Sequence, residues 1–150
     1  MERSWRPNVT VAIIIEREGR FLVVEEGTES GLRINQPAGH LELGESLLEA
    51  AVRETREESA HLFEPQPRVG IYQWRLPGSD VSYVRFTFAG EVGEALAGAV
   101  LDTGIVRALW LSEAELRNCA DRHRSPLILR SLDDWLAGRR YPLDMLWYQS

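Results

Sequence analysis

Carboxylate side chains gather near the end of one segment, Ser46 to about Ser59, which contains no Gly or Pro and favours a helix. On a helical wheel, Glu54, Glu57 and Glu58 share one face, and a separate, more apolar face can pack on a sheet. Negative charge is unfavourable in the last turns of a helix, and Glu54 and Glu58 repel each other at i,i+4 spacing. We therefore expect a positive charge to compensate these acids, and a divalent cation such as Mg²⁺ takes oxygen ligands of this kind.

The alternative is that these acids form a solvated helix face. The pairs Glu49–Arg53 and Arg53–Glu57 have opposite sign at i,i+4 spacing, which supports that alternative. Neither Glu54 nor Glu58, however, has a basic residue four positions away. Mg²⁺ usually combines a few carboxylates with substrate phosphates and water, so it could bridge this acidic chain and an anionic partner. A bound metal would lower the pKa of water, and a carboxylate would take the proton.

Length and charge narrow the class of protein. The chain has 150 residues, of which 44% are hydrophobic and 27% charged, and we expect residues 1–150 to form a single α+β domain. The net charge of −6 argues against a dedicated nucleic-acid binder. All 17 basic residues are Arg, and the absence of Lys excludes a Schiff-base lysine, a Walker-type P-loop and a kinase-type ATP lysine.

Cysteine use and hydropathy predict a cytoplasmic protein. Cys119 is the only cysteine, so no internal disulfide can form, and a reducing compartment is expected. We interpret Cys119 as an inert side chain near the end of a helix. The longest apolar run is Val11 to Ile15, and the beginning of the chain lacks an apolar signal region. We therefore expect neither a signal peptide nor a membrane span, and the oligomeric state stays open.

Strands in hairpins dominate the expected architecture. The β-branched segment Val9 to Ile15 indicates a strand buried on both faces, and Arg20 to Glu25 is expected to return beside it. A loop is expected over residues 26–38. Capping signals at Ser112/Glu115 and at Ser125-Pro126 predict two late helices. The other expected strands are Arg68–Leu76, Val81–Val92 and Ile105–Leu111.

A longer motif surrounds the acidic trio. It runs Gly39, five residues, Glu45, seven residues, Arg53-Glu54, two residues, Glu57-Glu58, and it resembles the signature of the Nudix hydrolases. The resemblance implies a Nudix-type α/β/α sandwich, with a mixed, mostly hairpin-built sheet and the motif helix beside it.

Three less strictly defined positions of this signature differ in this sequence. Thr55 replaces an aliphatic residue, Ala60 replaces a Gly, and His61 replaces an aliphatic residue. Ala60 predicts either strain or a different helix ending, because the left-handed conformation is about 1–2 kcal/mol less favourable for Ala than for Gly. We interpret His61 as a partly exposed loop histidine.

The resemblance also implies roles and a cofactor, Mg²⁺ or alternatively Mn²⁺. The carbonyl of Gly39 and the carboxylates of Glu57 and Glu58 would hold the metal. Glu54 would ligate a metal or water, or orient the attacking water. The implied supporting residues are Arg53, which would hold the acids in place, and Glu45, at the junction of loop and helix.

Further short segments, including Asn8–Ala12, Gly19–Glu26 and Asn35–Glu42, resemble a bacterial phosphatase branch of the family. This branch implies release of phosphate from nucleoside tri- and diphosphates, and from hydroxymethylpyrimidine pyrophosphate or thiamine pyrophosphate. Two alternatives stay open. One is cleavage of nucleoside-diphosphate derivatives such as ADP-ribose or a dinucleotide polyphosphate, and the other is a Nudix-like binding module without catalysis.

Candidates for substrate binding lie outside the acidic trio. Trp74 could stack on a base or belong to the core, and Arg85 could contact phosphate or lie on an exposed sheet face. Gln36 and His40 flank the Gly39 turn and could reach the substrate or only stabilise the loop. Asp102, in the Gly/Ala-rich stretch 93–104, is a candidate for an additional acidic base.

Overall fold

The computed structural model describes residues 4–150 and, within that range, every side chain except those of residues 67–69. The strands are β1 (Asn8–Ile14), β2 (Glu16–Arg17), β3 (Arg20–Thr28), β4 (Gly31–Asn35), β5 (Ala38–His40), β6 (Phe63–Arg75), β7 (Ser82–Val92) and β8 (Ile105–Ser112). The helices are α1 (Leu47–Ser59), α2 (Glu113–Asn118) and α3 (Leu127–Leu136), with 3₁₀ turns η1 (Ala120–Arg122) and η2 (Leu143–Met145).

Two sheets form the centre of the described chain. In the first, the order is β5-β1-β7-β6, and β1 pairs parallel to β7 but antiparallel to β5. In the second, β3 pairs antiparallel with β2, β4 and β8. The parallel β1–β7 pair makes the architecture mixed, whereas the remaining pairs are antiparallel, so the expected α+β fold is confirmed. Strand β3 forms its hairpin with β2 and not with β1, so the hairpin expected between Val9–Ile15 and Arg20–Glu25 is shorter than predicted.

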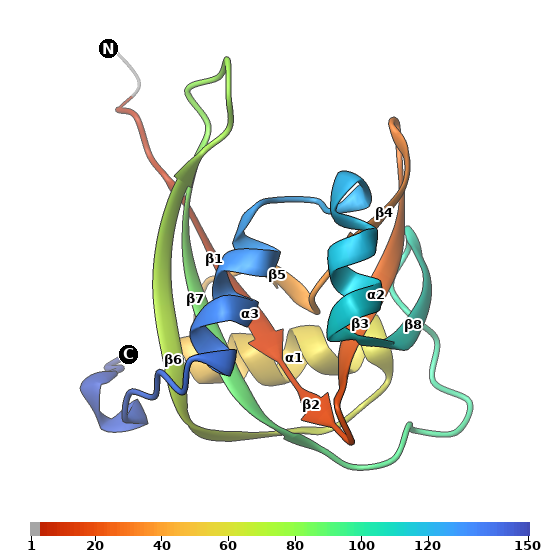
Figure 1. Ribbon diagram of the computed structural model, residues 1–150. Coiled ribbons are helices and arrows are strands. Elements are labelled where there is room, and N and C mark those ends of the chain that lie inside the picture. Colours follow the sequence, from red (N-terminus) through yellow and green to blue (C-terminus); the bar gives the residue numbers. More distant parts are fainter. Residues whose placement is uncertain (1–3) are drawn as a thin grey trace.

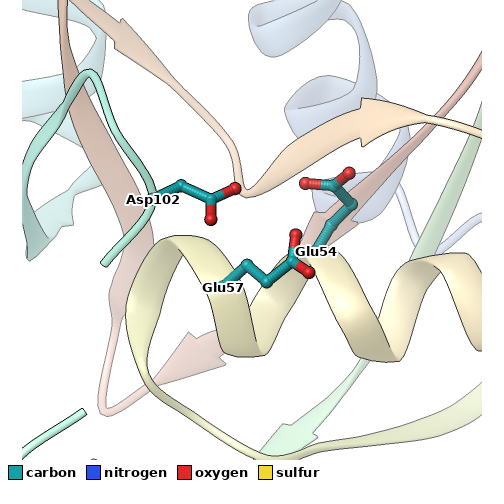
Figure 2. Close-up of side chains that lie close together, drawn as sticks. All are labelled: Glu54, Glu57 and Asp102. Atoms are coloured by element: carbon teal, nitrogen blue, oxygen red, sulfur yellow. The ribbon is translucent and has the colours of Figure 1, made fainter. Parts of the chain in front are cut away.

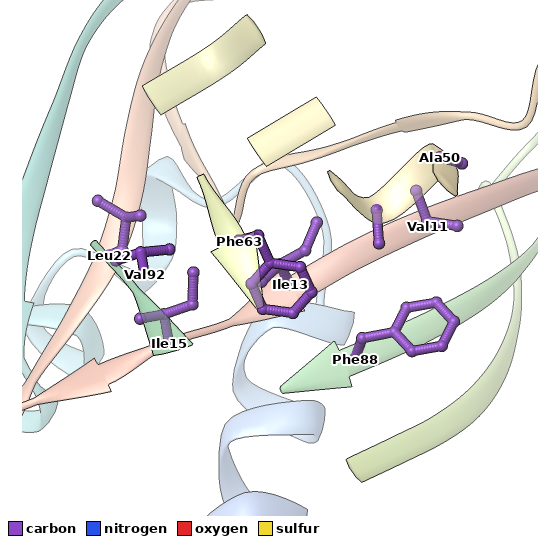
Figure 3. Packing of buried hydrophobic residues seen from close by; sticks show 9 residues of the cluster. Val11, Ile13, Ile15, Leu22, Ala50, Phe63, Phe88 and Val92 are labelled. Carbon is purple, nitrogen blue, oxygen red and sulfur yellow. The ribbon is translucent and has the colours of Figure 1, made fainter. Parts of the chain in front are cut away.

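Strand β1 is buried on both faces because its apolar residues alternate between two cores. Val11, Ile13 and Ile15 face a cluster that includes Ala50 of α1 and Phe88 of β7, as Figure 3 shows. On the opposite side, Ile14 joins a second cluster made with α2 and α3. The predicted doubly buried strand is therefore confirmed.

Helices cover both sides of the sheets. Helix α1 packs on the first cluster, and α2 and α3 pack on the second, so the layers form the expected α/β/α sandwich (Figure 1). Within residues 4–150, none of the helices has the length and apolar character that crossing a bilayer requires.

The prediction of a loop over residues 26–38 is wrong. Strand β3 continues to Thr28 and turns directly into β4, and β5 begins at Ala38. The Thr28 hydroxyl donates to the carbonyl of Gly31 at 2.7 Å, and Gly31 adopts a φ of 97°, so this glycine makes the turn instead of ending the strands. β6 also begins earlier than expected, at Phe63, because a register shift after Pro65 accommodates the proline.

Helix α1 has well-defined ends. Ser46 and Glu49 form a capping box at its start, as Ser112 and Glu115 do for α2. At its end, Ala60 takes the left-handed conformation (φ 59°) usually reserved for Gly, and its N–H donates to the Arg56 carbonyl. Ala60 therefore ends the helix in the conformation that a Gly would adopt, and its own carbonyl accepts the N–H of Leu96 at 2.7 Å.

Candidate active site

Three carboxylates converge at the C-terminal half of α1. Glu54 and Glu57 project from the helix, and Asp102 reaches toward them from the loop before β8 (Figure 2). Their ligand oxygens all lie within 4.8 Å of one another. The backbone N–H of Asp102 donates to the carbonyl of Glu57 at 2.9 Å, so a direct main-chain hydrogen bond fixes the loop beside the helix. Asp102, predicted as an additional acid, thus joins two members of the predicted trio.

Arg53 connects these acids to the preceding loop and strand. Its Nε and Nη2 donate to the two oxygens of Glu45 at 3.0 and 2.7 Å. Its Nη1 donates to Glu54 at 2.7 Å and to Glu57 at 3.1 Å, and its Nη2 also donates to the carbonyl of His40 at 3.0 Å. The carboxylate of Glu45 raises the pKa of Arg53 above its usual range. The rigid guanidinium fork thereby orients two of the clustered acids.

Glu58 is placed differently from the other two helix acids. It is buried and accepts the backbone N–H of Ala38 at 2.7 Å, outside the group formed by Glu54, Glu57 and Asp102. Burial, above all, raises the pKa of Glu58 to about 8, and the nearby carboxylates add to the effect. Burial likewise raises the pKa of Glu54, although Arg53 opposes the shift. Burial therefore disfavours the ionised form of both carboxyl groups, and a cation bound beside them would favour it.

Gly39 lies directly against this cluster. It pairs with Val11 between β5 and β1, and a Cβ added at residue 39 would overlap the carboxylate of Glu54. Only a residue without a side chain leaves room for Glu54 in this position.

The donor set fits a hard divalent cation such as Mg²⁺ or Mn²⁺. Such ions bind carboxylate and carbonyl oxygens and keep open positions for water and phosphate. Glu54, Glu57 and Asp102 offer three oxygens, all within 4.8 Å of one another, which is a suitable spacing for such an ion. Exposure increases from the buried Glu54 to the exposed Asp102, so the cluster opens toward solvent on the loop side.

A cavity of about 1040 Å³ adjoins the carboxylates. Both sheets, the loop carrying Asp102 and the segment before α3 contribute to its wall, which includes Glu58, Asp102, His40, Trp74 and Arg85. Acids, an arginine and aromatic rings therefore line the same cavity.

The predicted substrate-binding residues divide between the cavity and the core. His40, Trp74 and Arg85 line the cavity, and Trp74 stacks on Tyr83 with ring centroids 6.0 Å apart and planes at 19°. Gln36 does not line this cavity, because its side chain is buried and donates to the Ser131 hydroxyl of α3 at 2.9 Å.

Arg85 has two neutral neighbours that sequence reasoning missed. Its Nη2 donates to Asn35 Oδ1 at 3.2 Å, and its Nη1 to Ser125 Oγ at 3.4 Å. The side chain is only 6% exposed, so the alternative of an exposed sheet face is wrong. No local signal marks Asn35 or Ser125, since a bridge between β4 and His123 brings them together.

His61 also differs from expectation. It is buried instead of partly exposed, lies 2.7 Å from the Ser59 carbonyl through Nδ1, and packs edge-on against Trp110. His61 therefore fills a buried position against Trp110, where the signature has an aliphatic residue.

With this geometry in view, the sequence was compared with known proteins. The profile of the NUDIX domain family matches residues 5–132. The chain belongs to the Nudix hydrolase family. Phosphatase NudJ of Escherichia coli strain K12 is 40% identical over 142 residues, which are 95% of this chain and 92% of that protein. A solved Nudix hydrolase from Nitrosomonas europaea is 47% identical, with a TM-score of 0.93 over 96% of this chain and 98% of its own.

As a Nudix hydrolase, the chain is an enzyme that acts on phosphoric anhydride bonds of small phosphorylated substrates. Nudix hydrolases generally use divalent metals, and the cluster of Glu54, Glu57 and Asp102 provides oxygens that could bind one.

Proposed function

We propose that this Nudix hydrolase is a Mg²⁺-dependent phosphatase that releases orthophosphate from nucleoside tri- and diphosphates. Hydroxymethylpyrimidine pyrophosphate and thiamine pyrophosphate are further candidate substrates, and Mn²⁺ is the alternative metal. The observation that carries the proposal is the convergence of Glu54, Glu57 and Asp102 beside a cavity large enough for a small phosphorylated molecule. The 40% identity to phosphatase NudJ supports orthophosphate as the product.

In this proposal Glu54 and Glu57 hold the cation, with the Gly39 carbonyl and Glu58 as additional ligands, and Asp102 lies beside it. When bound, the cation neutralises charge on the phosphoryl oxygens and acidifies water. Arg53 keeps Glu54 and Glu57 aligned, and Glu45 in turn fixes Arg53 through two hydrogen bonds. This support matters because small displacements of reacting groups cost large factors in rate.

Asp102 is our candidate for accepting the proton of the attacking water. Within the described chain, its carboxylate has no hydrogen bond or ion pair, whereas Arg53 occupies oxygens of Glu54 and Glu57. Its exposed position also gives a proton a path to solvent. His40, Trp74 and Arg85 then contact the substrate in the cavity, where the Trp74–Tyr83 pair offers a flat surface for an aromatic ring.

A phosphate-release screen with Mg²⁺ or Mn²⁺ tests the proposal. The panel contains nucleoside tri- and diphosphates, hydroxymethylpyrimidine pyrophosphate, thiamine pyrophosphate, ADP-ribose and a dinucleotide polyphosphate, with products separated by chromatography. We expect free orthophosphate and a substrate shortened by one phosphate. Two phosphorylated fragments would instead indicate cleavage within nucleoside-diphosphate derivatives. Binding without hydrolysis of any compound would indicate a module without catalysis.

A further inference from the structure

Gln36 and Ser131 form a buried polar pair between the β4–β5 connection and helix α3. Gln36 is 5% exposed and Ser131 is 1% exposed. The Nε2 of Gln36 donates to the Ser131 hydroxyl at 2.9 Å, and this hydroxyl donates to the carbonyl of Ile128 at 3.2 Å. The Oε1 of Gln36 is also buried, and it has no hydrogen-bond partner among the described residues. The pair therefore satisfies only one end of the Gln36 amide.

This half-satisfied amide is unfavourable for the stability of the fold. A buried oxygen that has lost its water without gaining a partner lowers the free energy of unfolding, whereas an apolar side chain of similar shape does not. A partly satisfied polar network in the interior is also less favourable than an apolar core. A methionine would fill the position of Gln36 without this loss. Gln36 is therefore better explained by what it holds in place than by a contribution to stability.

The residues that follow Gln36 contact two carboxylates of α1. The backbone N–H of Ala38 donates to Glu58 at 2.7 Å, and Gly39 leaves the space that the carboxylate of Glu54 occupies. A single proline separates Gln36 from Ala38, and its ring fixes one of the backbone torsions between them. A displacement of Gln36 would therefore also displace the backbone beside both carboxylates.

Helix α3 gives this hydrogen bond a firm support. Ile128 and Leu132, which lie on either side of Ser131 in the helix, are 1% and 2% exposed, and Leu132 belongs to the second cluster. At the N-terminal end of the helix, Ser125 and Leu127 line the cavity. The Gln36–Ser131 bond therefore connects a helix at the cavity wall to the backbone next to the α1 carboxylates.

We propose that Gln36 and Ser131 are positioning residues, which hold residues 36–39 against Glu54 and Glu58 although the pair itself lowers the stability of the fold. The inference rests on the proposed function, since it takes these carboxylates as part of the metal site. Without the pair, residues 36–39 shift and the two carboxylates lose their alignment. The affinity for the metal and kcat then fall, whereas KM changes little because the residues that contact the substrate stay in place.

The test separates stability from activity with two variants, Ser131→Ala and the double variant Gln36→Met/Ser131→Ala. Ser131→Ala leaves the whole Gln36 amide unpaired, so its melting temperature should fall by about 4 °C. The double variant replaces both partners with apolar groups, so its melting temperature should return to the wild-type value or exceed it. In both variants kcat should fall about tenfold, with KM within about twofold of wild type.

Binding of Mn²⁺ without substrate, measured by electron paramagnetic resonance, provides a readout that needs no turnover. Residues that support metal ligands typically change metal affinity by about tenfold or more, so the dissociation constant for Mn²⁺ should rise about tenfold in both variants. A wild-type enzyme that releases no phosphate, but whose Mn²⁺ affinity depends on Gln36 and Ser131, refutes only the proposed function.

Thr87→Val is the matched control. Thr87 is 4% exposed, its hydroxyl has no hydrogen-bond partner among the described residues, and it is a cross-strand neighbour of Ala38 through Ala12. Valine keeps the shape of threonine and removes an unpartnered hydroxyl, but it leaves the Gln36–Ser131 pair intact. Thr87→Val should therefore keep the wild-type kcat and Mn²⁺ affinity, with a melting temperature that is not lowered.

The proposal is overturned if kcat recovers together with the melting temperature in the double variant, because the pair would then be only structural. A wild-type kcat in Ser131→Ala overturns it as well, and this single variant decides the matter if the double variant does not fold. An unchanged Mn²⁺ affinity in the variants, or an equal loss of kcat in Thr87→Val, has the same consequence.

Discussion

The carboxylate of Glu54 lies against the α-carbon of Gly39, in space that any side chain at residue 39 would occupy. Helix α1 and strand β5 therefore lie so close together at the candidate metal site that a Cβ at residue 39 would not fit between them. The contact explains the glycine by steric need, because Gly39 does not adopt a positive φ.

Gly39→Ala should displace Glu54 and lower kcat by about 100-fold, since the carboxylate would leave its position beside Glu57. The free energy of unfolding should fall by only about 1–2 kcal/mol, because the displaced atoms end a flexible side chain. Phosphate release and thermal melting measure the two effects. Gly93→Ala is the control, as a Cβ there meets nothing within 4 Å. Full activity in Gly39→Ala would contradict the role of this contact.

Glu57→Gln should abolish turnover while the fold stays intact, because the amide removes a charged ligand without changing the side chain's size. Glu49→Gln on the same helix is the matched control, since a glutamine still completes the capping box with Ser46. Turnover at the wild-type rate in Glu57→Gln with Mg²⁺ present would show that the assigned metal role is wrong.

Asp102→Asn should reduce kcat by about 100-fold or more, the usual contribution of a positioned general base. The loop should stay in place, because the backbone N–H of Asp102, not its side chain, bonds to Glu57. Asp144→Asn, a change of the same chemistry at an exposed residue outside the cavity, should leave kcat unchanged. If Asp102→Asn retains its kcat, another group accepts the proton.

Glu25 provides a test of stability against pH. It is buried between Arg107 and Arg122, at 2.5 and 2.9 Å, and the hydrogen bond from Arg107 lowers its pKa below the ordinary value of 4.5. A carboxylate with a lowered pKa stabilises the fold above the ordinary value, and this stabilisation is lost as the pH falls through the folded-state pKa.

Glu25→Gln should therefore lower the free energy of unfolding by about 1–3 kcal/mol near neutral pH. The difference from wild type should shrink once the pH falls below the ordinary value of 4.5. Denaturant titrations at several pH values measure it. A difference that is constant across the acid range would mean that the charge of Glu25 does not contribute.

Local sequence signals predicted those helices and helix faces that depend only on residues close together in the sequence. The capping residues Ser46 and Ser112 start helices where expected, and the spacing of Glu54 and Glu57 predicted their shared face. The turn at Gly31 was missed because a glycine between two strands looks the same whether it makes a turn or begins a loop.

Local sequence signals did not predict contacts between segments that are far apart in the sequence. Asp102 reaches Glu57 through a backbone hydrogen bond, and Ser125 reaches Arg85 across two layers. Neither contact depends on a recognisable local pattern, because both follow from how the loops dock on the finished sheets. The sequence therefore predicted the arrangement of the α1 carboxylates better than the contacts among the residues that line the cavity.

The hydrogen bonds of Arg53 join a helix, a loop and a strand through one guanidinium group, with Glu54, Glu45 and the His40 carbonyl as partners. A loosened chain can keep its secondary structure after specific packing is lost. Such a chain would separate these partners while α1 remained helical. On heating, inactivation should consequently precede the loss of circular dichroism, and enzyme assays become the earlier gauge of thermal damage.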